Sequence, residues 1–141
     1  MNDIVLELRK SFNTNKTKTL EWRVAQLKAL ERLLVENENE ICVALKTDLN
    51  KHSQETIITE IGMIKNAIIY ALEHIEDYVK PKEVAPQIQM RMLYSTYVQY
   101  QPFGIVLVIG SWNYPFQVYS AFFNLNFENF FNFIFRFVLF H

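Results

Sequence analysis

The most constraining feature of the sequence is a helical stripe of apolar residues between positions 57 and 79. Its members recur every three or four positions and are Ile57, Ile61, Ile64, Ile68, Leu72, Ile75 and Val79. This spacing places them on one face of a helix, and such a helix is stable only when that face is covered. Ser53 is a suitable N-cap for it, and Pro81 marks its end. The sequence therefore predicts a long helix packed against other apolar elements.

Two shorter patterns upstream supply the covering surface. After Thr19, a predicted N-cap, apolar residues recur at helical spacing until the polar run ENENE ends the pattern. The residues of this stripe are Leu20, Val24, Leu27, Leu30 and Leu34. A shorter helix follows, with the stripe Ile41, Ala44, Leu45 and Leu49. Roughly the first eighty residues are therefore predicted to be helical.

The period of the pattern changes beyond Pro86, from helical to alternating. The segment MRMLYSTYVQYQ alternates and is rich in Tyr, Thr and Val, which predicts a half-exposed strand. PFG is a turn signal, and the apolar run IVLVI (105–109) is typical of a strand covered on both faces. A two-stranded hairpin has little stability by itself. The predicted class is a truncated α/β fold: helices followed by a β-hairpin that lacks its sheet neighbours.

Composition and charge exclude several classes of protein. With 141 residues the chain is long enough for one domain with a hydrophobic core. Its net charge of −1 argues against binding to nucleic acid or to an anionic membrane. The one cysteine, Cys42, excludes an internal disulfide and indicates a reducing compartment such as the cytoplasm. The histidines are too dispersed for a metal site, and the N-terminus lacks the apolar segment of a signal peptide.

One segment carries residues suited to catalysis: GSWNYPF, which directly follows the predicted strand 105–109. Open α/β sheets bind ligands just beyond the carboxyl ends of such strands. Gly110 lets the main chain approach a ligand closely, and Pro115 restricts Tyr114. Asn113 offers a neutral amide donor of restricted orientation, which suits the stabilisation of an oxyanion. The alternative is a loop in which the aromatic rings merely pack and Asn113 caps the main chain.

The segment QPFGIVLVIGSWNYPFQ closely resembles a stretch characteristic of the class 3 aldehyde dehydrogenases, E-P-x-G-V-x-L-x-I-x-x-W-N-Y-P-F. Upstream, TLEWRVAQLKALERLLVENENEICVALKTDLNK is similar to the N-terminal helices of that family, where R-x-x-Q-L-x-A-L recurs before A-L-x-x-D-L. The resemblance covers residues 1–117. It implies the N-terminal part of an aldehyde dehydrogenase domain, with most of the parallel-sheet cofactor domain outside this chain.

The resemblance also implies a chemistry. Members of the family use NAD or NADP to oxidise an aldehyde, fatty or aromatic, to a carboxylic acid. A cysteine thiolate attacks the carbonyl, hydride leaves the thiohemiacetal for the nicotinamide, and a glutamate-activated water releases the acid. By position, Asn113 matches the oxyanion-hole residue, and the cofactor would lie along Ile109, Gly110, Ser111 and Trp112. The family further implies a homodimer, and it leaves open a C-terminal membrane anchor in the complete enzyme.

The sequence departs from the family in two minor positions and in one large respect. Ser111 stands where threonine is common and Gln101 where an acid is usual, and we expect little effect from either. After Gln117, neither the A-A-G-N run nor the V-L-K-P-S-E run of the family follows, and the catalytic cysteine and glutamate are absent. Cys42 lies in a predicted helix and is expected to be a buried hydrophobe. We therefore expect the chain to be inactive by itself.

Residues 118–141 differ in composition from the rest of the chain. They hold nine of the twelve phenylalanines and four asparagines, together with Glu128 and Arg136. Amides and charges interrupt the apolar residues too often for a transmembrane helix. Two alternatives to the enzyme fragment stay open: a non-catalytic helical module that binds a partner, and a small membrane-associated protein that uses this segment. We interpret the segment as translated intron, because its common residues have A/T-rich codons and Gln117–Val118 can be encoded by a splice-donor sequence.

The intron interpretation predicts the structure of the transcript. We expect the dominant message to be spliced after the Gln117 codon and to continue into codons for A-A-G-N and L-K-P-S-E. Sequencing of cDNA across this boundary measures it directly. A dominant message that runs unspliced through the Phe-rich codons to the stop would show that the interpretation is wrong.

Overall fold

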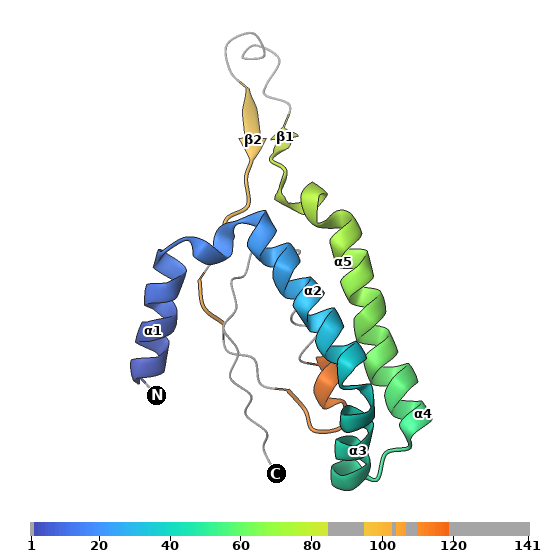
Figure 1. The fold of residues 1–141 in the computed structure, drawn as a ribbon. Helices are drawn as coiled ribbons and strands as arrows, with labels where there is room; N and C mark the ends of the chain where they lie inside the picture. The colour runs from blue at the N-terminus through green and yellow to red at the C-terminus, as the bar shows by residue number, and fades with distance from the viewer. Residues whose placement is uncertain (1, 85–94, 103, 107–109, 119–141) are drawn as a thin grey trace.

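A computed structural model of the chain describes residues 2–84, 95–102, 104–106 and 110–118 (Figure 1). The order of elements is α1 (Asn2–Asn13), η1 (Lys16–Lys18), α2 (Leu20–Glu36), α3 (Glu38–Leu49), α4 (Ser53–Glu55), η2 (Thr56–Gly62), α5 (Met63–Val79), β1 (Lys82–Val84) and β2 (Thr96–Val98). The described chain is thus mostly helical with a small antiparallel sheet, which confirms the predicted class: helices followed by a β-hairpin.

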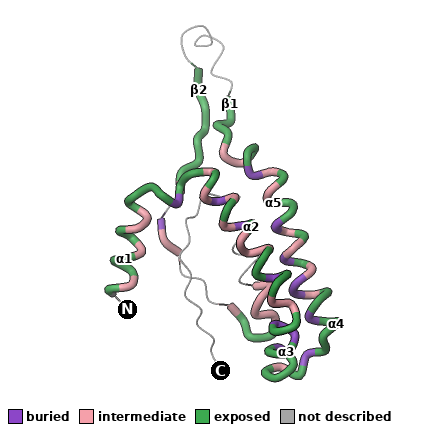
Figure 2. The backbone as a smooth tube through the Cα atoms, in the orientation of Figure 1, coloured by how far each residue is buried: buried purple, intermediate pink, exposed green. Residues whose placement is uncertain are grey.

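The centre of the fold is the packing of α2 against the helical segment that ends in α5. The two run side by side in opposite directions, with α3 at the end where the chain reverses (Figure 1). The predicted Thr19 cap is confirmed, since its side chain accepts a hydrogen bond from the Trp22 amide at 3.2 Å. The buried core consists of Leu27, Leu34, Ile41, Cys42, Leu45, Ile61, Ile64, Ile68, Ala71 and Ile75. The buried positions alternate along these helices with exposed ones (Figure 2).

The helix predicted from residue 53 to residue 79 is present, but its first half is not a regular α-helix. Residues Thr56–Gly62 form a π-helix between α4 and α5. A π-turn holds about one residue more than an α-turn, because its hydrogen bonds run from i to i+5. The extra residue rotates the upstream positions relative to the stripe. Ile57 is therefore 38% exposed, in contrast to its prediction, whereas Thr56 and Glu60 are fully buried.

Two other sequence predictions for the helices need correction. The N-cap of this segment is His52 and not Ser53, because the His52 ring nitrogen accepts from the Gln54 amide at 3.2 Å. In α3, Ala44 is exposed, and Cys42 takes its place in the core beside Ile41. The predicted burial of Cys42 is confirmed at 7% exposure.

The end of α3 sets the direction of the chain that follows. Asn50 adopts the left-handed conformation at φ 53°, and its amide hydrogen bonds to the Leu45 carbonyl. Asparagine and glycine tolerate this conformation best at a helix C-terminus. The next amide, of Lys51, also bonds to the Leu45 carbonyl, at 3.3 Å. The reversal places Lys51 against the start of the next helical segment.

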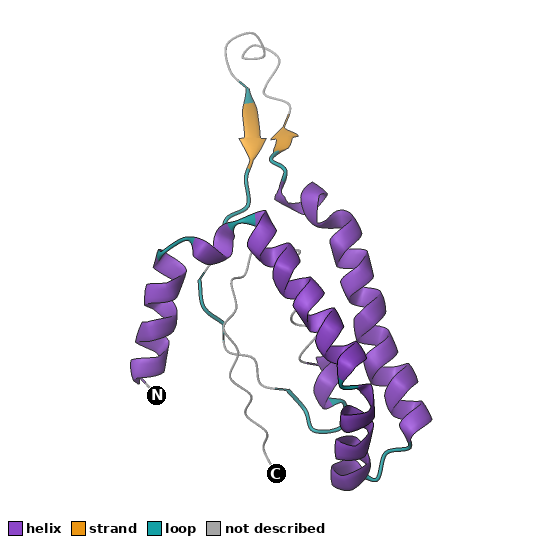
Figure 3. Ribbon diagram, viewed as in Figure 1, coloured by secondary structure: helices purple, strands orange, loops and turns teal. Residues whose placement is uncertain are grey.

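Of the two strands of the sheet, the sequence predicted β2 and did not predict β1. β2 lies within the predicted strand MRMLYSTYVQYQ, and it pairs antiparallel with β1, in the register Lys82 to Val98 (Figure 3). Ile105 and Val106 are not in a strand, and 107–109 lie outside the described residues. The hairpin extends from one end of the helices, and its strand residues are exposed (Figure 2). Gly104, at φ 129°, adopts a conformation that favours glycine, as the predicted turn requires.

Part of the sequence predictions concerns residues that the structure does not describe. The Phe-rich segment falls almost wholly in 119–141, outside the described residues. Among the helices of the described ranges, none is both long and apolar enough to cross a membrane.

The left-handed turn after α3 makes a specific prediction about Asn50. Replacement by valine, which is strained at φ 53°, should lower the free energy of unfolding by about 1–2 kcal/mol, whereas Asn50→Gly should be nearly neutral. Urea denaturation followed by circular dichroism measures the difference. Asn39→Val, at an exposed position inside α3, is the matched control and should change stability by less than about 0.5 kcal/mol. Equal effects at the two positions would contradict the account.

Candidate active-site turn

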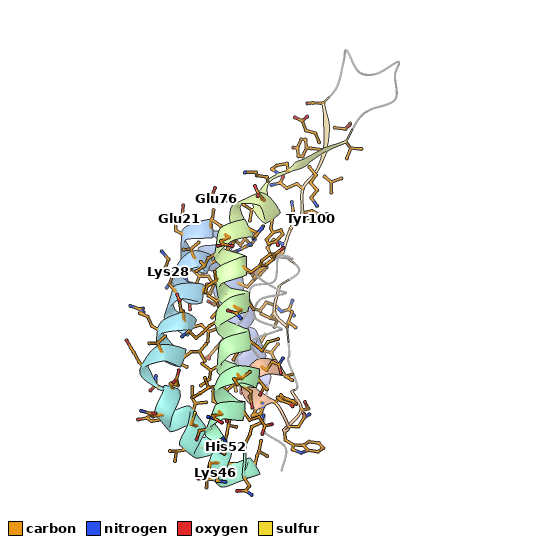
Figure 4. All side chains as sticks on the ribbon, turned by 90° about the vertical axis from the view of Figure 1, so that its right-hand side faces the viewer. Glu21, Lys28, Lys46, His52, Glu76 and Tyr100 are labelled. Atoms are coloured by element: carbon orange, nitrogen blue, oxygen red, sulfur yellow. The ribbon has the colours of Figure 1, made fainter. Side chains whose placement is uncertain are left out.

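A buried ion pair joins the end of α3 to the π-helix. The Lys51 Nζ atom lies 2.5 Å from Glu60 Oε1, and the two side chains are only 7% and 0% exposed. His52, the residue after Lys51, lies at the end of the molecule where the chain passes from α3 to α4 (Figure 4). Taking two charges out of water is costly and must be offset by their attraction and by further hydrogen bonds. The remaining polar contacts of the pair are therefore informative.

Those remaining contacts reach a segment far along the chain, the turn 113–116. Lys51 Nζ donates to the Asn113 carbonyl oxygen at 3.0 Å, 62 residues away in sequence. Glu60 Oε2 accepts from the Phe116 amide at 2.9 Å. The Lys51 ammonium also lies 3.9 Å above the centroid of the Tyr114 ring, within the range of a cation–π interaction. The ion pair therefore holds both ends of the turn.

The turn leads into a short helical segment at residues 115–118 (orange in Figure 1). The Val118 amide bonds to the Tyr114 carbonyl at 3.0 Å. Pro115 suits the first helical position, since its ring fixes φ and it has no amide to satisfy there. The first amides of a helix have no carbonyl one turn earlier in the helix to bond to, and the Glu60 carboxylate accepts from the Phe116 amide. The Phe116 side chain packs against the core, which holds the turn from its apolar side.

The sequence-predicted site residues lie at or just before this turn. Asn113 is exposed, and its main-chain carbonyl is the group that Lys51 binds. Ser111 and Trp112 are exposed, with Trp112 at 69%, and Gly110 is half-buried. Ile109 lies outside the described residues. Residues 111–113 are thus exposed, while the buried Lys51–Glu60 pair holds the main chain of the turn by hydrogen bonds.

The sequence profile of the aldehyde dehydrogenase family matches residues 1–123. This chain belongs to the aldehyde dehydrogenase family. The fold agrees with that assignment. A solved structure of Staphylococcus aureus AldH in a substrate-bound state matches this aldehyde dehydrogenase chain with a TM-score of 0.87 and 29% sequence identity. The match covers 94% of this chain and 29% of the AldH chain.

Curated relatives place the chain beside family 3 enzymes. It is 38% identical over 108 residues to aldehyde dehydrogenase family 3 comG of Dictyostelium discoideum, which covers 77% of this chain and 23% of that protein. It is 39% identical over 113 residues to an aldehyde dehydrogenase of Craterostigma plantagineum, with 80% and 23% covered. The dimeric NADP-preferring enzyme of Canis lupus familiaris is 34% identical over 120 residues, with 84% and 26% covered. This aldehyde dehydrogenase chain spans about a quarter of the length of these relatives.

The one cysteine of the aldehyde dehydrogenase chain is not placed for nucleophilic attack. Cys42 is buried in α3, and its Sγ atom donates to the Ser53 carbonyl at 4.0 Å. Burial raises the pKa of the Cys42 thiol, and the nearby Glu38 carboxylate raises it further. Both effects favour the thiol over the thiolate, which is the reactive form. In the described part of the chain, no group of three or more His, Cys, Asp or Glu side chains could hold a metal ion.

Sequence reasoning missed the two residues that organise this turn, Lys51 and Glu60. A signal for Glu60 was present, because it precedes Ile61 and lies four residues before Ile64, on the apolar side of the predicted helix. A charged side chain on such a face needs a partner. For Lys51 the signal was weaker: it directly follows Asn50, a residue that often ends helices.

The buried pair makes a prediction about stability. Glu60→Leu alone leaves the Lys51 ammonium buried without its partner, and should lower the free energy of unfolding by about 3–5 kcal/mol. The double variant Lys51→Met/Glu60→Leu removes both charges at similar volume, and should recover most of that loss. Urea unfolding curves measure both. A double variant as unstable as Glu60→Leu would contradict the account, since the single loss would then not come from an unpaired charge.

Proposed function

We propose that this chain supplies one wall of the active site of an NAD(P)-dependent aldehyde dehydrogenase, which oxidises an aldehyde to a carboxylic acid through a cysteine thiohemiacetal. The observation that supports this most strongly is the anchored turn. In a chain of this family, the exposed Asn113 is carried by a main chain that a buried cation holds in place. The stabilisation of an oxyanion requires a donor that is already oriented, and a main chain held in place helps to orient the amide.

The proposed role of Asn113 is to donate its side-chain amide to the oxyanion of the thiohemiacetal. A neutral donor stabilises negative charge that develops in the reaction, and it need not lose a proton itself. Because Lys51 binds the Asn113 carbonyl, the residue does not have to reorganise when the charge appears. Fixed donors of this kind contribute more than mobile ones, since the cost of orienting them is met on folding.

The cofactor proposal concerns the segment before the turn. When bound, the nicotinamide accepts the hydride that leaves the substrate carbon. Gly110 and Ser111 have small side chains, and Ser111 and Trp112 are exposed, so the described chain fits a ligand that lies along its main chain. We assign NAD or NADP to Ile109, Gly110, Ser111 and Trp112. The relatives named dimeric and NADP-preferring support a homodimer and a nicotinamide cofactor.

The remaining chemistry needs groups that this chain does not contain. The family mechanism requires a reactive thiolate, and the one cysteine here is buried with a raised pKa. We therefore assign the nucleophile, the general base and most of the cofactor domain to sequence beyond residues 1–117, and we expect the 141-residue chain to be inactive alone. We further assign the complete enzyme to the cytoplasm, and residues 118–141 to a segment outside the enzyme domain.

A hybrid enzyme tests this function. Residues 1–117 replace the matching segment of the canine NADP-preferring relative, and a soluble hybrid with cooperative melting is assayed with hexanal or benzaldehyde and NAD or NADP. We expect the hybrid to be active and the 141-residue chain to give only the blank rate. Asn113→Ala should lower kcat of the hybrid by about 10²–10³-fold, the usual effect of losing one oxyanion donor.

The matched control for that variant is Asn66→Ala, at an exposed position on α5. It should leave kcat of the hybrid unchanged. If Asn113→Ala keeps the kcat of the unaltered hybrid, the oxyanion role is wrong. If a folded hybrid oxidises neither aldehyde, the proposed function itself is contradicted.

A further inference from the structure

We propose that Lys51 and Glu60 are positioning residues for the reaction: their buried ion pair sets the orientation in which Asn113 meets the oxyanion. This inference rests on the proposed function and deepens it, since it assigns a catalytic purpose to two side chains that do not reach the surface. Three features of the structure carry it. The first is the pair of hydrogen bonds that hold the two ends of the turn, from Lys51 to Asn113 and from Phe116 to Glu60, which we call the grip. The second is the burial of the ion pair, and the third is that each of its polar atoms has a separate partner.

The grip fixes the main chain around Asn113 at both sides. Lys51 binds the Asn113 carbonyl at 3.0 Å, and Glu60 binds the Phe116 amide at 2.9 Å. Between these two contacts lies Pro115, whose ring fixes its own φ and restricts Tyr114. The stretch 113–116 therefore keeps few free main-chain torsions. With its backbone held this way, the Asn113 side chain starts from a defined position.

The burial of the pair shows that packing alone does not explain it. Glu60 is 0% and Lys51 is 7% exposed. A buried ion pair generally stabilises a fold no better than two apolar side chains of the same volume. Apolar side chains, however, could bond to neither the Asn113 carbonyl nor the Phe116 amide. The contribution specific to the charged pair is thus the placement of the turn.

Each end of the turn is bound by a different atom of the pair: Lys51 Nζ binds Asn113, and Glu60 Oε2 binds Phe116. One carboxylate oxygen of Glu60 binds Lys51 and the other accepts from the Phe116 amide. A glutamine has a single acceptor oxygen and cannot serve both contacts. The Lys51 ammonium likewise faces Glu60, the Asn113 carbonyl and the Tyr114 ring. Glu60→Gln therefore removes one anchor of the turn with almost no change in volume.

Hydrogen exchange of the intact 141-residue chain tests the grip. Mass spectrometry at low protein concentration follows the amides of 113–118 and those of α2 and α5. In Lys51→Met/Glu60→Leu, which leaves no acceptor at position 60, we expect the Phe116 amide to exchange at least about tenfold faster than in the unaltered chain. In the double variant the core amides should keep their protection, because no charge is left buried without a partner. Glu55→Gln, at an exposed position of the same helical segment, should change neither set.

An unchanged Phe116 exchange rate in the double variant would overturn the proposal. Equal loss of protection in the turn and in the core would also overturn it, since the pair would then be merely structural. This measurement uses neither catalysis nor the hybrid enzyme, so it tests whether the ion pair holds the turn independently of the proposed function.

Kinetics of the hybrid test the catalytic consequence. The double variant should lower kcat at least about tenfold, while KM for the nicotinamide cofactor stays within about threefold, because the loss falls on the oxyanion and not on cofactor binding. Glu55→Gln should leave both unchanged. A hybrid that loses activity with Asn113→Ala but keeps it in the double variant would overturn the positioning role and leave the proposed function intact. A folded but inactive parent hybrid would overturn the proposed function and this catalytic role together.

Discussion

The interaction on which the described structure depends is the buried contact between Lys51 and Glu60. It joins the end of α3 to the π-helix, and it holds a turn that lies more than fifty residues further along the chain. Three parts of the sequence therefore meet in one buried polar cluster. Because each charge is buried, neither can be removed alone without leaving the other unpaired. The turn 113–116 and the helical core are consequently coupled through this contact.

The π-helix and the left-handed Asn50 make the contact possible. The wider π-turn buries Thr56 and leaves Ile57 at the surface, while Glu60 stays on the apolar side that the sequence pattern gives it. Asn50 reverses the chain after α3, so that Lys51 meets Glu60. Single π-turns inside α-helices occur frequently at functional sites. In this chain of the aldehyde dehydrogenase family, the π-helix carries Glu60, which binds the Phe116 amide of the turn 113–116.

Local patterns predicted the helices well, and long-range polar contacts not at all. Thr19 and the buried positions Ile61, Ile64, Ile68 and Ile75 follow from capping and periodicity, because both depend on neighbouring residues. Ile57 was misplaced because periodicity assumes a constant turn. The pairing of β2 with β1 was not predicted, because alternation identifies a strand but not its neighbour. Lys51 binds Asn113 across 62 residues, and no spacing rule connects such positions. Its place after an apolar run located GSWNYPF and resemblance to the family gave it a role, but only the structure showed what holds it.

The contact between Lys51 and the Tyr114 ring allows the central claim to be tested by one measurement in solution. An ammonium 3.9 Å from an aromatic centroid places its neighbouring methylene protons in the shielding region of the ring. The account predicts an upfield shift of the Lys51 ε-methylene protons in the NMR spectrum, with nuclear Overhauser contacts to the Tyr114 ring, and loss of both in Tyr114→Leu. Ordinary lysine shifts without such contacts would show that the buried pair does not hold the turn, and would contradict the account.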